Sequence, residues 1–207
     1  MIIVGYPGIG KSTTANKNAL CIDLESSMFN DEFGNKIEDW YKYYCNVAID
    51  LHNQGKTVFV SNHSDVYNQL SKYELAKTDL AFIFPSLQLH DAWVDKLRDR
   101  YYEDSLKKNE NAWLRASNCY KEDIENLINF VKQNNYKYWT VNHLDYNLDE
   151  IIDSLAQGYS SNNIDEVNRI CGNCHYFTGI GDFNLACRKH PDLCYTFTKA
   201  CVDYEEK

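Results

Sequence analysis

The first thirteen residues, MIIVGYPGIGKST, constrain this chain more than any other stretch. An apolar run at residues 2–4 predicts a buried strand, and the following segment, GYPGIGKS, fits the pattern G-x-x-x-x-G-K-[ST] at every fixed position. Glycines let backbone N–H groups turn inward around an anion, a lysine adds positive charge, and the serine hydroxyl can ligate Mg²⁺. A helix beginning at Lys11 would direct its positive dipole end to the same point. The pattern therefore predicts a nucleoside triphosphate bound by Gly5, Pro7, Gly8, Ile9, Gly10, Lys11, Ser12 and Thr13.

Length and charge narrow the class of protein. The 207 residues, 44% of them hydrophobic, suffice for one α/β domain with a small appendage. The net charge of −9 argues against a broad surface for nucleic acid or an anionic membrane. The longest apolar run, residues 80–84, is too short to cross a bilayer, and Met1 leaves no room for a targeting peptide before the first strand. We expect a soluble, cytoplasmic protein with no membrane partner.

Strand-like and helix-like patterns alternate along most of the chain. The predicted strands cover residues 2–4, 20–24, 57–61, 80–84 and 137–142. The predicted helices cover residues 11–18, 37–53, 65–76, 90–102, 120–133 and 148–155. This alternation predicts a parallel five-stranded sheet with helices on both faces. A polar joint at residues 157–165 separates this domain, residues 1–156, from a cysteine-rich module at residues 166–207.

Polar residues follow the predicted strands where each strand ends. They are Asp23 and Glu25, the segment Ser61 to His63, Ser86, and Asn142 with His143. Ligands of open parallel sheets bind beyond the carboxyl ends of the strands, so we expect these residues to form one site with the phosphate loop. Glu25 is the weaker candidate, because alternation along its strand could direct it to solvent.

Taken in order, these motifs resemble those of P-loop small-molecule kinases. The phosphate loop is followed by the segment DLESS at residues 23–27, by SNH after the third strand, by Pro85 after the fourth, and by a helix ending in RDRY at residues 98–101. The branch it resembles is the nucleoside monophosphate kinase-like proteins of bacteriophages and mobile elements, over residues 1–156. The resemblance implies a three-layer α/β/α fold. It also implies Mg²⁺-dependent transfer of a phosphoryl group from ATP to a nucleotide or similar small acceptor, in the host cytoplasm if a phage encodes the chain.

The resemblance also implies roles for single residues. Asp23 would face the acceptor or a water on Mg²⁺, unless it only caps a turn. Arg98 and Arg100 match arginines that close over the transferred phosphate. Because residues two apart on a helix cannot share a face, we predict that Arg100 acts there. Residues 103–118 are polar and lack strong periodicity, and their cations Lys107, Lys108 and Arg115 would belong to a lid or to a solvated loop.

Two positions after the third strand leave alternatives open. Enzymes of this kind usually carry an aspartate there, but this chain has Ser61 and Asn62. Asp23 could organise the metal instead, Ser61 could do so through water, or the site could bind nucleotide without efficient catalysis. His63 would contact phosphate, act as a general base, or be a hydrogen-bonded structural residue.

The cysteine-rich module needs a separate explanation. Five of the eight cysteines lie between residues 171 and 201, in a segment too small and too poor in aliphatic residues to fold by hydrophobic burial. A C-x2-C pair offers two thiolates to one metal, so we predict a zinc site of Cys171, Cys174, Cys187 and Cys201, with Cys194 or His190 as substitutes. The tail resembles small zinc-binding modules. An iron–sulfur cluster is the second choice and disulfides are the third.

Two other functions fit the same motifs. One is a nucleotide-binding switch or ATPase whose zinc module docks a protein partner. The other is a kinase acting on a hydroxyl of modified DNA or of a polynucleotide end; the acidic charge counts against it, while the abundant aromatic residues could stack on bases.

Overall fold

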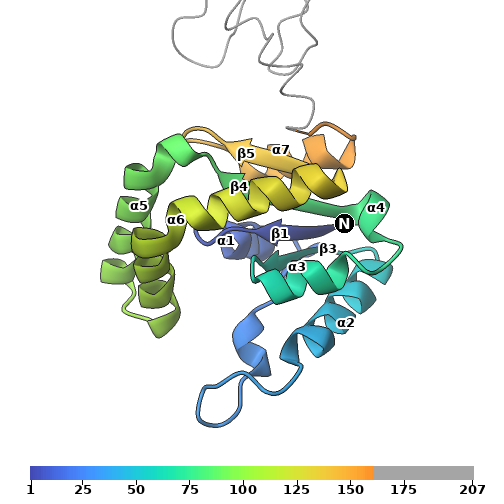
Figure 1. Cartoon of the computed structure of the whole chain (residues 1–207), viewed down its shortest axis with the longest axis horizontal. Helices are drawn as coiled ribbons and strands as arrows, with labels where there is room; N and C mark the ends of the chain where they lie inside the picture. The colour runs from blue at the N-terminus through green and yellow to red at the C-terminus, as the bar shows by residue number, and fades with distance from the viewer. Residues whose placement is uncertain (161–207) are drawn as a thin grey trace, which may run out of the picture. The chain divides into compact units, whose positions relative to one another are not determined.

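A five-stranded, all-parallel sheet forms the centre of the protein (Figure 1). The computed structural model of the chain describes residues 1–160. The strands are β1 (Ile2–Gly5), β2 (Cys21–Asp23), β3 (Thr57–Ser61), β4 (Leu80–Pro85) and β5 (Lys137–Val141), in the order β2-β3-β1-β4-β5. The prediction of an α/β fold with five parallel strands is therefore confirmed.

The central strands are apolar along their whole length because both of their faces are covered. Every residue of β1 and of β4 is buried, without the alternation that a half-exposed strand shows. In register, Gly5 at the end of β1 lies beside Ser61 of β3 and Ile83 of β4. The segment that follows Gly5 therefore leaves the sheet at its middle, between β3 and β4. From β1 the chain first runs toward one edge of the sheet and later toward the other, and ligands of such folds bind at this reversal of strand order.

Seven α-helices and two short 3-10 helices accompany the sheet in residues 1–160. They are α1 (Lys11–Lys17), η1 (Ser26–Phe29), α2 (Trp40–Asn53), α3 (Ser64–Leu70), α4 (Ala76–Asp79), η2 (Leu87–Leu89), α5 (His90–Glu103), α6 (Lys107–Asn134) and α7 (Leu148–Ala156). Connections between parallel strands are right-handed crossovers. Connections that run toward β2 therefore cover one face of the sheet, and connections that run toward β5 cover the other face. In Figure 1, α3 and α6 cross in front of the sheet.

Two predicted helices differ from the observed ones. The helix predicted to start at residue 120 begins at Lys107, so most of the expected lid loop is helical. Its first half packs on α5: the Trp113 ring stacks on Tyr101 at 5.7 Å, and the Asn109 amide donates to the Asp104 carbonyl at 3.0 Å. Because the buried positions here include Asn109 and Ala116, which are not strongly hydrophobic, the sequence carries only a weak periodic signal. The predicted helix at residues 65–76 is divided into α3 and α4.

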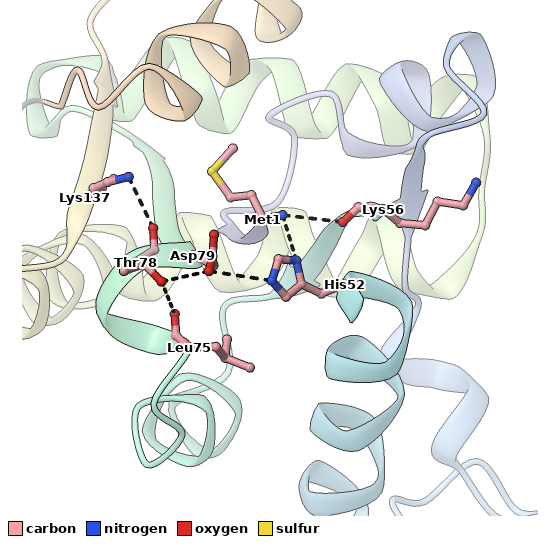
Figure 2. A network of polar contacts seen from close by, with 7 residues as sticks. All are labelled: Met1, His52, Lys56, Leu75, Thr78, Asp79 and Lys137. Atoms are coloured by element: carbon pink, nitrogen blue, oxygen red, sulfur yellow. Dashed lines mark hydrogen bonds and ion pairs between the residues drawn. The ribbon is translucent and has the colours of Figure 1, made fainter. Parts of the chain in front are cut away.

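Polar contacts close the amino-terminal edge of the sheet (Figure 2). The Met1 amine contacts His52 Nδ1 at 2.9 Å, and His52 Nε2 lies 3.8 Å from Asp79 Oδ2. The Thr78 hydroxyl donates to the Asp79 carboxylate at 2.8 Å, and Lys137 Nζ donates to the Thr78 carbonyl at 3.2 Å. These contacts join the end of α2 and α4 to the first residues of β5 and the start of β1. The opposite, carboxyl edge is the one that opens onto a cleft.

No helix within residues 1–160 is both long enough and apolar enough to span a membrane.

Candidate functional site

A cleft of about 1560 Å³ lies beyond the carboxyl ends of the strands. The loop between β1 and α1 forms its floor, and residues after β2 and β3 line one part of its wall. Helices α5 and α6 supply the rest of the lining, mainly with charged and amide side chains. Of the predicted binding residues, Pro7, Gly8, Gly10, Lys11, Ser12 and Thr13 line this cleft.

The loop adopts a conformation that depends on its glycines. Gly8 and Gly10 have φ angles of 86° and 95°, in the left-handed region where a side chain is strained. Two aromatic side chains support the loop from behind: Trp93 Nε1 donates to the Pro7 carbonyl at 2.9 Å, and the Tyr146 hydroxyl donates to the Gly8 carbonyl at 3.5 Å. The loop is therefore held in place by α5 and by the segment after β5.

The Lys11 ammonium folds back onto its own loop. Nζ donates to the Gly5 carbonyl at 2.7 Å and to the Tyr6 carbonyl at 3.5 Å. Burial lowers the pKa of Lys11 to about 8, although the negative charges of Asp23 and Glu25 act to raise it. Neutral carbonyls compensate the ammonium only in part, so an anion in the cleft would be a better partner. Gly5 contributes its carbonyl, while the Ile9 side chain lies in the core and not in the cleft.

Ser12 and Asp23 meet directly beside this lysine. The Ser12 hydroxyl donates to Asp23 Oδ2 at 2.5 Å, although the two residues belong to different elements. A hydroxyl and a carboxylate at this spacing are oxygen ligands of the kind that Mg²⁺ takes. Ser61, at the end of β3, also lines the cleft, and its N–H donates to the Tyr44 hydroxyl at 2.9 Å. The side chains of Ser12 and Asp23 fit a magnesium site.

The two arginines of α5 differ in their surroundings. Arg98 pairs on the helix surface with Asp95 at 2.8 Å and with Asp99 at 3.6 Å. Arg100 lines the cleft, and its buried Nε has no hydrogen-bond partner within the described part of the chain. Burial lowers the pKa of Arg100, and the carboxylates of Glu25, Asp104 and Asp23 oppose that shift. Arg100 is therefore the arginine available to an anion in the cleft.

The other predicted lid cations already have acidic partners. Lys107 is exposed and pairs with Glu110 at 2.6 Å. Lys108 reaches across the cleft to Glu25 at 2.9 Å, which gives Glu25 a place in the cleft wall and not in solvent. Arg115 is held by Asp123 through two hydrogen bonds of 2.9 and 2.6 Å.

His63 lies in the cleft at the start of α3. Its ring packs edge-on against Trp40, with the ring centres 5.4 Å apart. Enclosure by the surrounding protein, followed by the positive charges of Lys36 and Arg115, lowers the pKa of His63. The imidazole is therefore neutral at pH 7 and able to accept a proton or a hydrogen bond.

Other strand-end residues lie outside the cleft. Ser86 is buried and its carbonyl accepts from the Tyr120 hydroxyl at 2.8 Å, so its role is structural. Asn142 and His143 are exposed and do not line the cleft, whereas the neighbouring Leu144 does.

The cleft also contains residues that the sequence analysis did not select. Among them are Tyr6, Lys36, Tyr67, Lys96, Asn109, Asp123 and Asn126. Lys96 Nζ lies over the Trp93 ring at 4.4 Å and over the Tyr146 ring at 5.1 Å, an arrangement that forms only when α5 meets the segment after β5. A helical sequence pattern could not identify such residues, because their partners come from other elements.

Residues 1–160 contain no cluster of three or more histidine, cysteine or acidic side chains that could hold a metal. The predicted zinc ligands Cys171, Cys174, Cys187 and Cys201 lie outside the described residues.

No protein-family model matches this sequence, and no curated protein matches it.

Proposed function

We propose that this chain is a kinase that transfers a phosphoryl group from ATP, with Mg²⁺, to a nucleotide or a similar small acceptor. One observation carries the proposal: Lys11, the hydrogen-bonded pair Ser12–Asp23 and Arg100, whose Nε has no hydrogen-bond partner within residues 1–160, line a single cleft at the carboxyl edge of the sheet. Catalysis of phosphoryl transfer consists mostly of positioning and charge neutralisation, and these are the groups that it requires.

Lys11 and the backbone N–H groups of the loop would bind the outer phosphates of ATP. The ammonium would exchange its contacts with the carbonyls of Gly5 and Tyr6 for phosphate oxygens. This exchange offsets the cost of keeping Lys11 charged in a buried place, so part of the binding free energy would come from relief of that cost.

Ser12 and Asp23 would hold the metal, with Ser61 contacting one of its waters. Mg²⁺ would neutralise charge on the phosphates during transfer. In this arrangement Asp23 takes the part of the aspartate that is missing after β3, and the Ser12–Asp23 hydrogen bond supports that reading. Arg100, whose Nε has no partner within residues 1–160, would contact the phosphoryl group as it moves to the acceptor.

The test is a transfer assay with labelled ATP, Mg²⁺ and a panel of nucleoside monophosphates, compared with a reaction without acceptor. The Lys11→Ala variant should lose ATP binding and transfer, because it removes the lysine of the phosphate loop. Lys17→Ala is the matched control: it removes an exposed lysine of the same helix that does not line the cleft, and it should behave as wild type.

Three results would count against the proposal. Equal ATP affinity in the Lys11→Ala variant and in wild type would refute nucleotide binding by the loop. Release of phosphate at the same rate with and without every acceptor would indicate an ATPase or a switch. Transfer to DNA ends but to no mononucleotide would indicate the polynucleotide kinase.

A further inference from the structure

Two residues of α6, Arg115 and Asp123, line the cleft together with His63 before α3 and Tyr67 of α3. Burial raises the pKa of Tyr67 and lowers that of His63, and the charge of Arg115 acts on both groups. Neither Arg115 nor Asp123 has a part in binding ATP as proposed above.

Asp123 fixes the orientation of Arg115. The Asp123 side chain is only 9% exposed, and its two oxygens accept from Nε and Nη2 of Arg115 at 2.9 and 2.6 Å. The Arg115 side chain is 64% exposed, and its Nη1 has no hydrogen bond to any of residues 1–160. A planar guanidinium bound by one edge presents its other donors in a fixed direction. The free edge of Arg115 thus offers hydrogen-bond donors to the cleft.

The charge of this pair is already balanced. A phosphate that approached Arg115 would also approach the Asp123 carboxylate that holds it, whereas Arg100 forms no direct ion pair with a carboxylate of residues 1–160 and is the better partner for a phosphate. A neutral ring with exposed acceptor atoms suits the Arg115–Asp123 pair instead. Tyr6 and Tyr67 line the cleft there but are only 2% and 8% exposed and pack in the core, so such a ligand would be recognised by the free edge of Arg115 and not by stacking.

We propose that Arg115, held by Asp123, selects the base of the acceptor nucleotide and favours oxo bases over amino bases. This inference rests on the proposed function. Guanine presents O6 and N7, and thymine presents O4, all of which accept hydrogen bonds from an arginine. Adenine and cytosine present an amino group at the corresponding position, and that donor would oppose the donors of Arg115. Arg115 is the specificity-determining residue and Asp123 is its positioning residue.

The experiment compares the affinities of GMP with AMP and of dTMP with dCMP. Each is titrated calorimetrically into the full-length protein in the presence of Mg²⁺ and a non-hydrolysable ATP analogue. We expect each oxo base to bind about 10-fold or more tightly than its amino counterpart, as for other contacts between arginine and a base edge. Equal or reversed affinities in wild type would overturn the inference.

Variants then test whether Arg115 causes the preference. Removing Arg115 alone would leave Asp123 buried without its cation, so the main variant is the double substitution Arg115→Gln with Asp123→Asn, which replaces the ion pair by two amides. It should bring both affinity ratios close to one and leave the affinity for the ATP analogue unchanged. Arg115→Lys keeps the charge but not the planar fork, and should reduce both ratios as well. A preference that survives in these variants would refute the assignment.

Two controls complete the design. Lys121→Gln removes a cation from an exposed pair with Glu125 on the same helix, away from the cleft, and should keep both ratios. Binding of the ATP analogue alone separates the two proposals. If wild type does not bind the analogue, the proposed function fails. If it binds the analogue and does not discriminate between bases, only the present inference fails.

Discussion

Replacing Gly8 by alanine should destabilise the domain more than replacing a turn glycine whose added Cβ atom would contact no other atom. Gly8 has φ +86°, and a Cβ atom there would lie 2.9 Å from Leu97 Cδ2 and 3.3 Å from Trp93 Nε1. Neither neighbour can move easily. Both are fully buried, and Trp93 Nε1 donates to the Pro7 carbonyl at 2.9 Å. The substitution would therefore combine backbone strain with overpacking.

Gly55 provides the matched control. It has φ +82°, and a Cβ atom would meet nothing within 4 Å. The left-handed conformation costs an alanine about 1–2 kcal/mol, partly offset by the stiffer unfolded chain, so Gly55→Ala should cost about 1 kcal/mol. Overpacking in a rigid core adds about 1–3 kcal/mol, so Gly8→Ala should cost about 2–4 kcal/mol.

Urea unfolding of the full-length protein under reducing conditions, followed by tryptophan fluorescence, measures both values. All four tryptophans of the chain lie in the first 160 residues, so the signal reports on this domain. With an m-value of about 2 kcal/mol/M, the midpoint should fall by about 1–2 M for Gly8→Ala and about 0.5 M for Gly55→Ala. Combining Gly8→Ala with Leu97→Ala should cost less than the sum of the two single changes, because the second change creates space. Equal midpoints for the two glycine variants would refute the reasoning.

Three further predictions follow from the arginines of α5, from His52 and from the cysteine-rich module. Arg100→Gln should lower phosphoryl transfer about 100-fold or more, whereas Arg98→Gln should stay within about two-fold, because Arg100 lines the cleft and Arg98 pairs with acids on the helix surface; equal losses in a steady-state assay would contradict this. Burial, followed by the positive charge of the Met1 amine, lowers the pKa of His52 in the folded protein. Protonation of His52 therefore favours the unfolded chain, and the free energy of unfolding should fall as pH drops below about 6.5. Urea unfolding at pH 7 and 5.5 should show a smaller fall in His52→Gln, and an unchanged fall would exclude His52 as a cause. Metal analysis of the full chain should find about one zinc, lost when Cys171 and Cys174 are both replaced by serine; iron with acid-labile sulfide would indicate a cluster instead.

The sequence alone determined the parts of this protein that depend on local pattern. The prediction of a phosphate-binding loop rests on glycines, a lysine and a hydroxyl at fixed spacing within eight residues, and this pattern is complete in the sequence itself. The strands β1 and β4 could be predicted because fully covered parallel strands are uninterrupted apolar runs. The Asn147 cap of α7 was equally local: its side chain accepts from the Asp149 N–H at 3.0 Å. In each case the residues that form the feature are also neighbours along the chain.

The tertiary structure decided what depends on contacts between distant elements. Arg98 and Arg100 are the same residue type in one motif, and only the packing of α5 turns Arg100 to the cleft and leaves Arg98 with the acids of its own helix. The sequence predicts Lys108 as a cation of a lid or a polar loop, but the packing of α6 places it across the cleft from the segment after β2, where it pairs with Glu25 at 2.9 Å. Ser12 and Asp23 meet because α1 begins, and β2 ends, at the carboxyl edge of the sheet. A side chain's partners are set by how helices pack, and that packing is a property of the whole domain.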